Sequence, residues 1–196
     1  LNTNIYYMDY KNQLVLTGAI DDVGAAIRTT SGSSYRLGLE IDADIRLSDV
    51  FSIRPNAAFS SNKNKDYFIT RDGEDTPEAL GDTDLSFSPD VVIGNVFTYA
   101  PGENLQISLL SKYVGKQFIS NFSSAISTND VLESFFTSDI NIVYALKSKT
   151  IFKSVVFSAL INNVFNKEYV DRGYYYTYED NWSTSEEITT LDGAGY

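Results

Sequence analysis

The 196-residue sequence predicts an all-β fold: a segment of a transmembrane antiparallel β-barrel with short turns at one end and long loops at the other. The first observation is the run Arg36–Leu47, in which every odd position is apolar and every even position is charged or glycine. A period of two is typical of a β-strand with one apolar and one wet face. A tilted strand needs roughly 9–11 residues to cross a bilayer, and this run is long enough. The second observation is that short and long connections alternate along the chain, as they do in outer-membrane barrels.

Seven strands are expected, in chain order, at Leu1–Leu16, Ser34–Leu47, Phe51–Asn62, Phe87–Ala100, Asn104–Val114, Phe136–Leu146 and Lys153–Phe165. Three of the breaks between them, at Leu47–Val50, Ala100–Glu103 and Lys147–Thr150, have the length and residue types of tight turns. The remaining connections are long and polar. An immunoglobulin-like sandwich would instead show turn signals every 8–12 residues.

The alternation assigns a face to most residues of the second, third and fourth strands. We expect the lipid-facing side chains to be Leu37, Leu39, Ile41, Ala43, Ile45, Leu47, Phe51, Ile53, Ala57, Phe59, Phe87, Val91, Ile93, Phe97 and Tyr99. The inward set is Arg36, Glu40, Asp42, Asp44, Arg46, Ser52, Arg54 and Asn56. The pattern of Leu1–Leu16 supports no assignment. Pro55 and Pro89 fall inside expected strands and require a bulge or an unpaired position there.

Composition and charge narrow the class of protein. The chain is 43% hydrophobic with a mean hydropathy of -0.17, an average in which the inward polar residues of a barrel cancel the outward apolar ones. No run of about 18 apolar residues is present, which excludes a transmembrane helix. The net charge of -11 lies entirely in four polar segments, Thr17–Ser33, Ser61–Ser86, Gly115–Phe135 and Asn166–Tyr196. Acidic loops argue against nucleic acid as a partner and indicate solvation, with attraction of cationic or metal-bearing ligands as the alternative.

The sequence indicates no enzyme. It contains no His and no Cys, so a Ser-His-Asp triad, a Cys-His pair and the usual zinc sites are impossible within it. The acidic run Asp72–Asp75 lacks the ligand spacing of a calcium loop and is interpreted as a solvated loop tip. We therefore expect no catalytic residue, no metal site and no cofactor.

Aromatic residues fit the membrane interpretation. The chain has 14 Tyr and 12 Phe, and Tyr99, Tyr113, Tyr144 and Phe152 lie close to expected strand ends. Barrels carry such residues as girdles at both membrane interfaces, although aromatic enrichment is also common in other β-proteins.

The segment Leu160–Tyr169 narrows the interpretation further. Its apolar strand runs into Asn162-Asn163-Val164-Phe165-Asn166-Lys167, and the asparagines can satisfy backbone groups where the strand leaves the membrane. This stretch resembles the penultimate-strand signature of TonB-dependent outer-membrane receptors. Gly38-Leu39-Glu40 and Lys112–Phe118 resemble other elements of that family, and Ser86–Asp90 is similar to a strand start in its Bacteroidetes-type members.

The resemblance covers the whole chain and implies a fold and a function. The chain would be a partial C-terminal region of the barrel domain, about seven of some 22 strands, with the plug domain and the final strand outside residues 1–196. It implies location in the outer membrane of a Gram-negative bacterium and active uptake of a scarce nutrient. The implied partners are outer-membrane lipid, the TonB complex acting through the plug, and a small ligand. An iron–siderophore complex is the first choice, with glycan, cobalamin and haem open.

Ligand-binding residues are expected in the last long loop. Aromatic side chains beside polar ones make rigid, adaptable contact surfaces, and the candidates are Tyr174, Tyr175, Tyr176, Tyr178 and Trp182. The alternative is that Tyr174–Tyr178 extend the preceding strand and join the outer aromatic girdle. Two other functions remain open: a passive porin or channel, and a soluble β-sandwich that acts as a binding or adhesin module.

Overall fold

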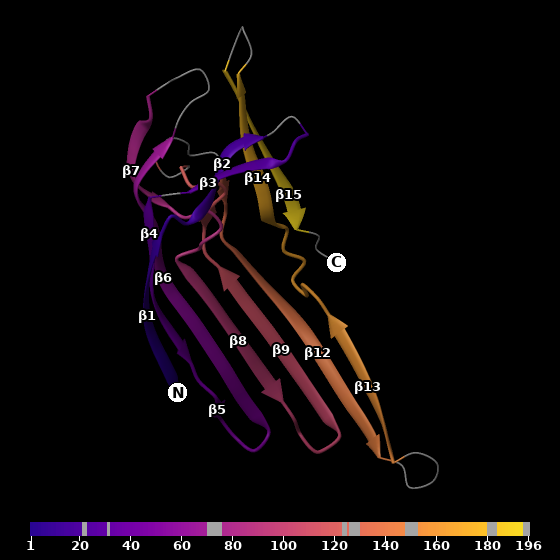
Figure 1. Ribbon diagram of the computed structural model, residues 1–196. Coiled ribbons are helices and arrows are strands. Elements are labelled where there is room, and N and C mark those ends of the chain that lie inside the picture. Colours follow the sequence, from indigo (N-terminus) through magenta and orange to yellow (C-terminus); the bar gives the residue numbers. More distant parts are fainter. Residues whose placement is uncertain are drawn as a thin grey trace.

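A computed structural model describes residues 1–20, 23–30, 32–69, 76–122, 125, 130–147, 153–179 and 184–193 (Figure 1). Its elements are strands: β1 (Asn2–Lys11), β2 (Leu14–Ile20), β3 (Ala26–Thr30), β4 (Ser33–Asp42), β5 (Ile45–Arg46), β6 (Phe51–Ile69), β7 (Glu78–Asp84), β8 (Val91–Tyr99), β9 (Leu105–Val114), β10 (Gln117–Phe118), β11 (Val131–Leu132), β12 (Phe135–Lys147), β13 (Ser154–Ile161), β14 (Tyr169–Glu179) and β15 (Thr184–Gly193). Within these residues no helix is long and apolar enough to cross a membrane.

The main sheet is antiparallel and follows the order β1-β4-β6-β8-β9-β12-β13, with β5 and β7 paired to β6. These seven strands correspond one to one with the seven expected from the sequence, which confirms the predicted all-β fold. The sheet is not closed, because β1 and β13 are its edges. The bounds differ mainly at five places. Asn12, with a φ of 56°, separates β1 from β2, and the second expected strand is divided into β4 and β5. In addition, β6 runs on to Ile69, β8 begins only at Val91, and β13 already ends at Ile161.

Pro55 lies inside β6, and the neighbouring strand is interrupted opposite it. The Pro55 carbonyl accepts a hydrogen bond from the Ala43 amide at 3.0 Å, so the Pro55 nitrogen also points toward that neighbour. Because proline has no N–H, one ladder bond is missing, and the gap between β4 and β5 falls at Ala43 and Asp44. Pro89 causes no interruption because it precedes β8.

The register confirms two faces of opposite character. Apolar residues line up across successive strands on the outer face, for example Ile53, Phe97, Leu109, Ile140 and Ile161. A second row joins Ile41, Ala57, Ile93, Tyr113 and Phe136. The same register places Ile5 and Tyr7 of β1 on the outer face, opposite Leu39 and Leu37. Phe87 is an exception to the expected outward set, because it lies before β8 in a turn with a φ of 50°.

The outer face also contains a short polar row. Asn95, Ser111 and Ser138 are register partners on β8, β9 and β12, and the hydroxyls of Ser111 and Ser138 lie 2.9 Å apart. Small and polar side chains therefore interrupt the apolar surface at one level of the sheet.

The main sheet forms a single layer. Leu37, Ile45 and Leu47 of the expected outer row are 43%, 41% and 57% exposed. A β-sandwich would bury such a row against a second sheet about 10 Å away. The other described sheets, β2–β3, β10–β11 and β14–β15, have two strands each. The described fold is therefore not a sandwich.

Connections differ in length between the two ends of the sheet, as expected. At the short-turn end, residues 47–50 join β5 to β6 and residues 100–104 join β8 to β9. The opposite end carries β2–β3, β7, β10–β11 and β14–β15, and Figure 1 shows β2, β3, β7, β14 and β15 gathered there. The sequence predicts loops for these segments, but the chain forms paired strands within them.

Candidate functional site

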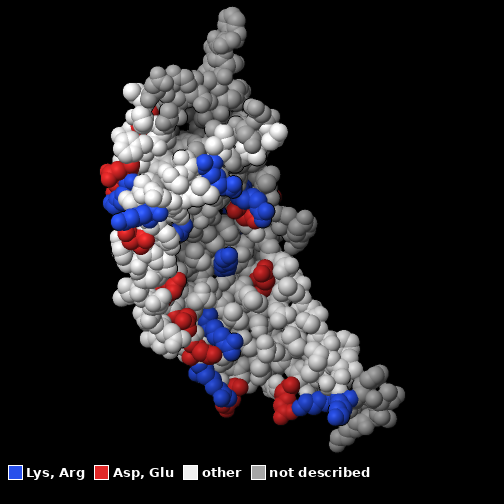
Figure 2. Space-filling model, in the orientation of Figure 1, with Lys and Arg blue, Asp and Glu red and all other residues white. Residues whose placement is uncertain are grey.

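The inner face of the sheet is wet and carries both signs of charge. Arg54 Nε donates to Asp44 at 3.0 Å, and the amide side chains of Asn4 and Asn2 donate to Glu40 and Asp42 at 3.0 and 2.8 Å. These contacts confirm the inward assignment of the acidic residues of β4. Figure 2 shows basic and acidic side chains interleaved along this side of the molecule rather than gathered into patches of one sign.

A shallow hollow of about 340 Å³ lies in the middle of this face. Its wall includes Asn56, Gly94, Lys112, Thr137 and Asp139 from four adjacent strands. Gly94 keeps the hollow open, because a Cβ there would lie 2.8 Å from the Asn56 side-chain oxygen. A side chain larger than glycine at this position would displace Asn56.

The strand-rich connections at the long-connection end share one small apolar core. Its buried members are Val15, Tyr67, Ile119, Phe122 and Leu132, and Ile69, Leu80 and Val170 pack against it. These residues come from β2, β6, β7, β11, β14 and the segment after β10. Burial raises the pKa of the Tyr67 hydroxyl, as expected for a phenol in apolar surroundings. The core therefore holds separate connections together as one wall.

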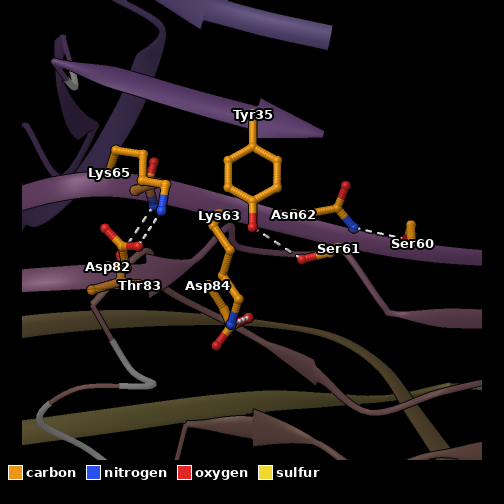
Figure 3. Close-up of polar contacts among 10 residues, drawn as sticks. Tyr35, Ser60, Ser61, Asn62, Lys63, Lys65, Asp82, Thr83 and Asp84 are labelled. Atoms are coloured by element: carbon orange, nitrogen blue, oxygen red, sulfur yellow. Dashed lines mark hydrogen bonds and ion pairs between the residues drawn. The ribbon is translucent and has the colours of Figure 1, made fainter. Parts of the chain in front are cut away.

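Two ion pairs attach β7 to the upper part of β6 (Figure 3). Lys63 bonds Asp84 at 2.5 Å, and Lys65 bonds Asp82. The hydrogen bond between the Lys65 ammonium and the Asp82 carboxylate raises the pKa of Lys65 and lowers the pKa of Asp82. On the other face of β6, the Asn64 amide donates to the Thr83 hydroxyl at 3.1 Å, with both side chains fully buried.

Asn163 organises the turn that follows β13. It has a φ of 47°, and its side chain both accepts from the Lys167 amide and donates to the Lys167 carbonyl at 3.0 Å. Its own amide donates to the Asp139 carboxylate at 2.7 Å, and the Val164 amide donates to the Ser138 carbonyl at 2.8 Å. The structure thus confirms that Asn163 satisfies backbone groups at a strand end.

The predicted ligand-binding tyrosines lie in the β14–β15 hairpin. Tyr174, Tyr175, Tyr176 and Tyr178 pair through their backbones with Thr189, Ile188, Glu187 and Ser185. They do not continue β13, which ends at Ile161. Their side chains lie outside the described part of the structure, as do Trp182, Phe152 and the acidic run at residues 72–75.

The base of this hairpin is fixed to the inner wall. Tyr169 stacks on Phe135 with ring centroids 4.3 Å apart, and Val170 packs on the apolar core. Neither this anchorage nor the apolar core is predicted by the sequence pattern. The sequence feature that could have indicated the core is the presence of isolated apolar residues, such as Ile119 and Phe122, within a polar segment.

No group of three or more metal-binding side chains occurs among the residues that the structure describes.

No protein-family model matches the chain, and no curated protein matches it by sequence. Solved structures do match in fold. The siderophore receptor PiuA of Acinetobacter baumannii aligns with a TM-score of 0.64 and 18% identity, covering 97% of this chain and 24% of that one. The ferric-catecholate import receptor Fiu of E. coli K12 aligns at 0.57 and 14%, covering 97% and 24%. The ferric yersiniabactin uptake receptor FyuA of Yersinia pestis aligns at 0.58 and 14%, covering 98% and 27%.

The chain thus spans about a quarter of the length of these three structures. All three are named as receptors, one for siderophores, one for ferric-catecholate import and one for ferric yersiniabactin uptake. At this level of identity the likeness shows the fold: an antiparallel sheet that resembles part of the barrel of such receptors.

Proposed function

We propose that the chain forms part of the barrel wall of an outer-membrane receptor that actively imports a scarce nutrient. The observation that carries the proposal is the single-layer sheet with an apolar outer face and a charged inner face. Such a layer is stable where lipid contacts one side and water the other. The fold match to siderophore and ferric-chelate receptors supports the same function.

The membrane orientation follows from the two ends of the sheet. Short turns of barrels lie on the periplasmic side and long connections outside the cell. Phe51 stacks on Tyr99 at 4.7 Å and lies 5.5 Å from Phe97, all on the outer face near the short turns. This cluster would form the periplasmic aromatic girdle, with outer-membrane lipid as the partner of the apolar rows.

We further propose that the chain is the partial C-terminal region of a TonB-dependent receptor of about 22 strands. The plug domain, the final strand and the contact with the TonB complex would lie outside these 196 residues, as the partial coverage of the similar structures suggests. The comparisons give no support for a Bacteroidetes-type assignment, and it is not part of the proposal.

The proposed ligand is an iron–siderophore complex. The names of the three similar receptors support this choice. Tyr174, Tyr175, Tyr176, Tyr178 and Trp182 would contact it from the β14–β15 hairpin, whose base is anchored at Tyr169 and Val170. An anchored hairpin presents aromatic rings at a smaller entropic cost than a free loop does.

Uptake of radioactive iron by the natural, full-length protein in its own bacterium tests the proposal. We expect iron–siderophore uptake to require the protein and to stop when TonB is inactivated. Changing the four tyrosines and Trp182 together to Ala should raise the half-saturating ligand concentration, whereas Tyr144→Ala at the short-turn end should not. Uptake that persists without TonB would instead indicate a passive channel.

A further inference from the structure

A small cavity of about 130 Å³ lies where the β2–β3 hairpin meets the upper inner wall. Its polar lining is Gln13, Arg28, Arg36, Ser86 and Asn121, and Val15 is among its apolar neighbours. These residues come from five separate segments of the chain. The apolar core described above includes Val15 and Phe122, the residue after Asn121, so the cavity lies against a packed base.

The acceptor oxygens around this cavity are already occupied. The Ser34 hydroxyl donates to Oε1 of Gln13, and the Ser86 amide donates to Oδ1 of Asn121 at 3.1 Å. These two bonds leave the NH₂ donor of each amide side chain unused. Asn121 is only 2% exposed, so its orientation is fixed by packing as well as by this bond.

The two arginines of the cavity differ from the other described arginines. Arg46, Arg54 and Arg172 each bond an aspartate, namely Asp49, Asp44 and Asp171. Arg36 instead donates to the Asn62 side-chain oxygen at 3.4 Å. Within the described residues no carboxylate bonds Arg28 or Arg36. Two positive charges and two amide side chains thus line one small space, and no described carboxylate is bonded to either arginine.

We propose that this cavity binds an oxyanion, a carboxylate or a phosphate group. The planar guanidinium matches both groups with paired N–H donors. The volume of the cavity limits the size of what it can bind. Complete small-molecule ligands occupy pockets of roughly 300–1,000 Å³. A cavity of about 130 Å³ therefore accepts one anionic group and not a whole ligand. If the proposed import function holds, the group would belong to the imported ligand; otherwise the site takes a free anion.

Titration with inorganic phosphate and with citrate, followed by calorimetry on the natural, full-length protein in detergent, tests the site. We expect both anions to bind and Arg36→Gln and Arg28→Gln each to weaken binding about tenfold or more. Arg54→Gln is the matched control, because that arginine faces the same interior and is already paired with Asp44. Absence of binding, or an equal loss in Arg54→Gln, would overturn the proposal.

A second variant guards against misfolding of the arginine variants. Gln13→Glu places a carboxylate in the cavity with little change in shape, and we expect it to abolish anion binding while the protein stays folded. Gln106→Glu makes the same change on β9, away from the cavity, and should leave binding intact. Retained phosphate binding in a folded Gln13→Glu variant would contradict the site.

The same preparations separate this site from the import function. Phosphate binding without TonB-dependent uptake would leave the oxyanion site standing and count against the importer. TonB-dependent uptake without phosphate or citrate binding would support the importer and count against the oxyanion site. Competition of phosphate with iron–siderophore uptake would show that the cavity holds a group of the ligand rather than a separate anion.

Discussion

At the scale of single residues, Asn163 shows how one side chain sets a strand end. We expect Asn163→Ala to loosen the turn by about 2 kcal/mol, because it removes two side-chain bonds to Lys167 and places alanine at a left-handed φ. Hydrogen exchange of the Asn163 and Val164 backbone amides measures the effect, and we expect their exchange rates to rise roughly 30-fold.

Asn166 provides the control for this prediction. It has a similar φ of 50°, but its contact in the turn is made by its backbone amide, which donates to the Asn163 carbonyl. Asn166→Ala places alanine at the same kind of left-handed φ without removing the Asn163 side-chain bonds, so it should accelerate exchange less. Equal acceleration in both variants would show that the backbone angle, and not the side chain of Asn163, holds the turn.

At the scale of elements, the Lys65–Asp82 ion pair that helps to attach β7 to β6 depends on pH only in strong acid and strong base. The pKa of Asp82 lies below its ordinary value of 3.8, so its stabilising bond to Lys65 is present above that value and is lost as the pH falls through the lowered pKa. The pKa of Lys65 lies above 10.5, so the same bond is present below that value and is lost as the pH rises through the raised pKa.

We therefore expect the contribution of this pair to the protection of β7 to stay constant between about pH 5 and pH 9 and to be lost in strong acid. Hydrogen exchange of β7, corrected for the intrinsic rate at each pH, is the measurement. Asp82→Asn should remove this part of the acid response, whereas Glu103→Gln, which affects the pair with Lys147 at the other end, should leave it unchanged. An unaltered response in Asp82→Asn would assign it to another group.

Elements differ in how far the sequence predicts them. Strands with one lipid and one wet face, such as β4, carry a strict period of two, and the seven main strands were predictable in order and approximate extent. The strands within the long connections were not, because both their faces are polar or mixed and their pairing depends on contacts distant in sequence. The core around Leu132 and the base of β14 illustrate this: Tyr169 needs Phe135, which is far away along the chain.

The ligand-binding role of the aromatic residues in the last long connection stays a prediction. The structure places the backbones of the four candidate tyrosines in one anchored hairpin, and Trp182 lies outside the described residues. The oxyanion cavity was not predictable, because Gln13, Arg28, Arg36 and Asn121 become neighbours only when separate segments fold together.

At the scale of the whole molecule, the distinction between the two faces of the sheet depends on lipid. Leu109 and Leu110 are adjacent in the middle of β9, and the register places Leu109 with Phe97 and Ile140 on the outer face and Leu110 with Val96 and Asp139 on the inner face. A lysine at position 109 would face hydrocarbon, where it costs about 2–4 kcal/mol near the midplane. A lysine at position 110 would face water and lie opposite the Asp139 carboxylate, so its cost should be below about 1 kcal/mol.

Denaturant unfolding of the natural, full-length protein from phospholipid vesicles measures both variants. The two substitutions are both Leu→Lys and lie one residue apart, so the effects of β-propensity and of position in the chain are the same in both. The difference between their costs therefore reports only which face of the sheet the lysine is on. A large difference in the expected direction requires lipid on the outer side of the sheet. Equal costs, or a larger cost at Leu110, would mean that the apolar rows are covered by protein, and both the membrane location and the import function would then be wrong.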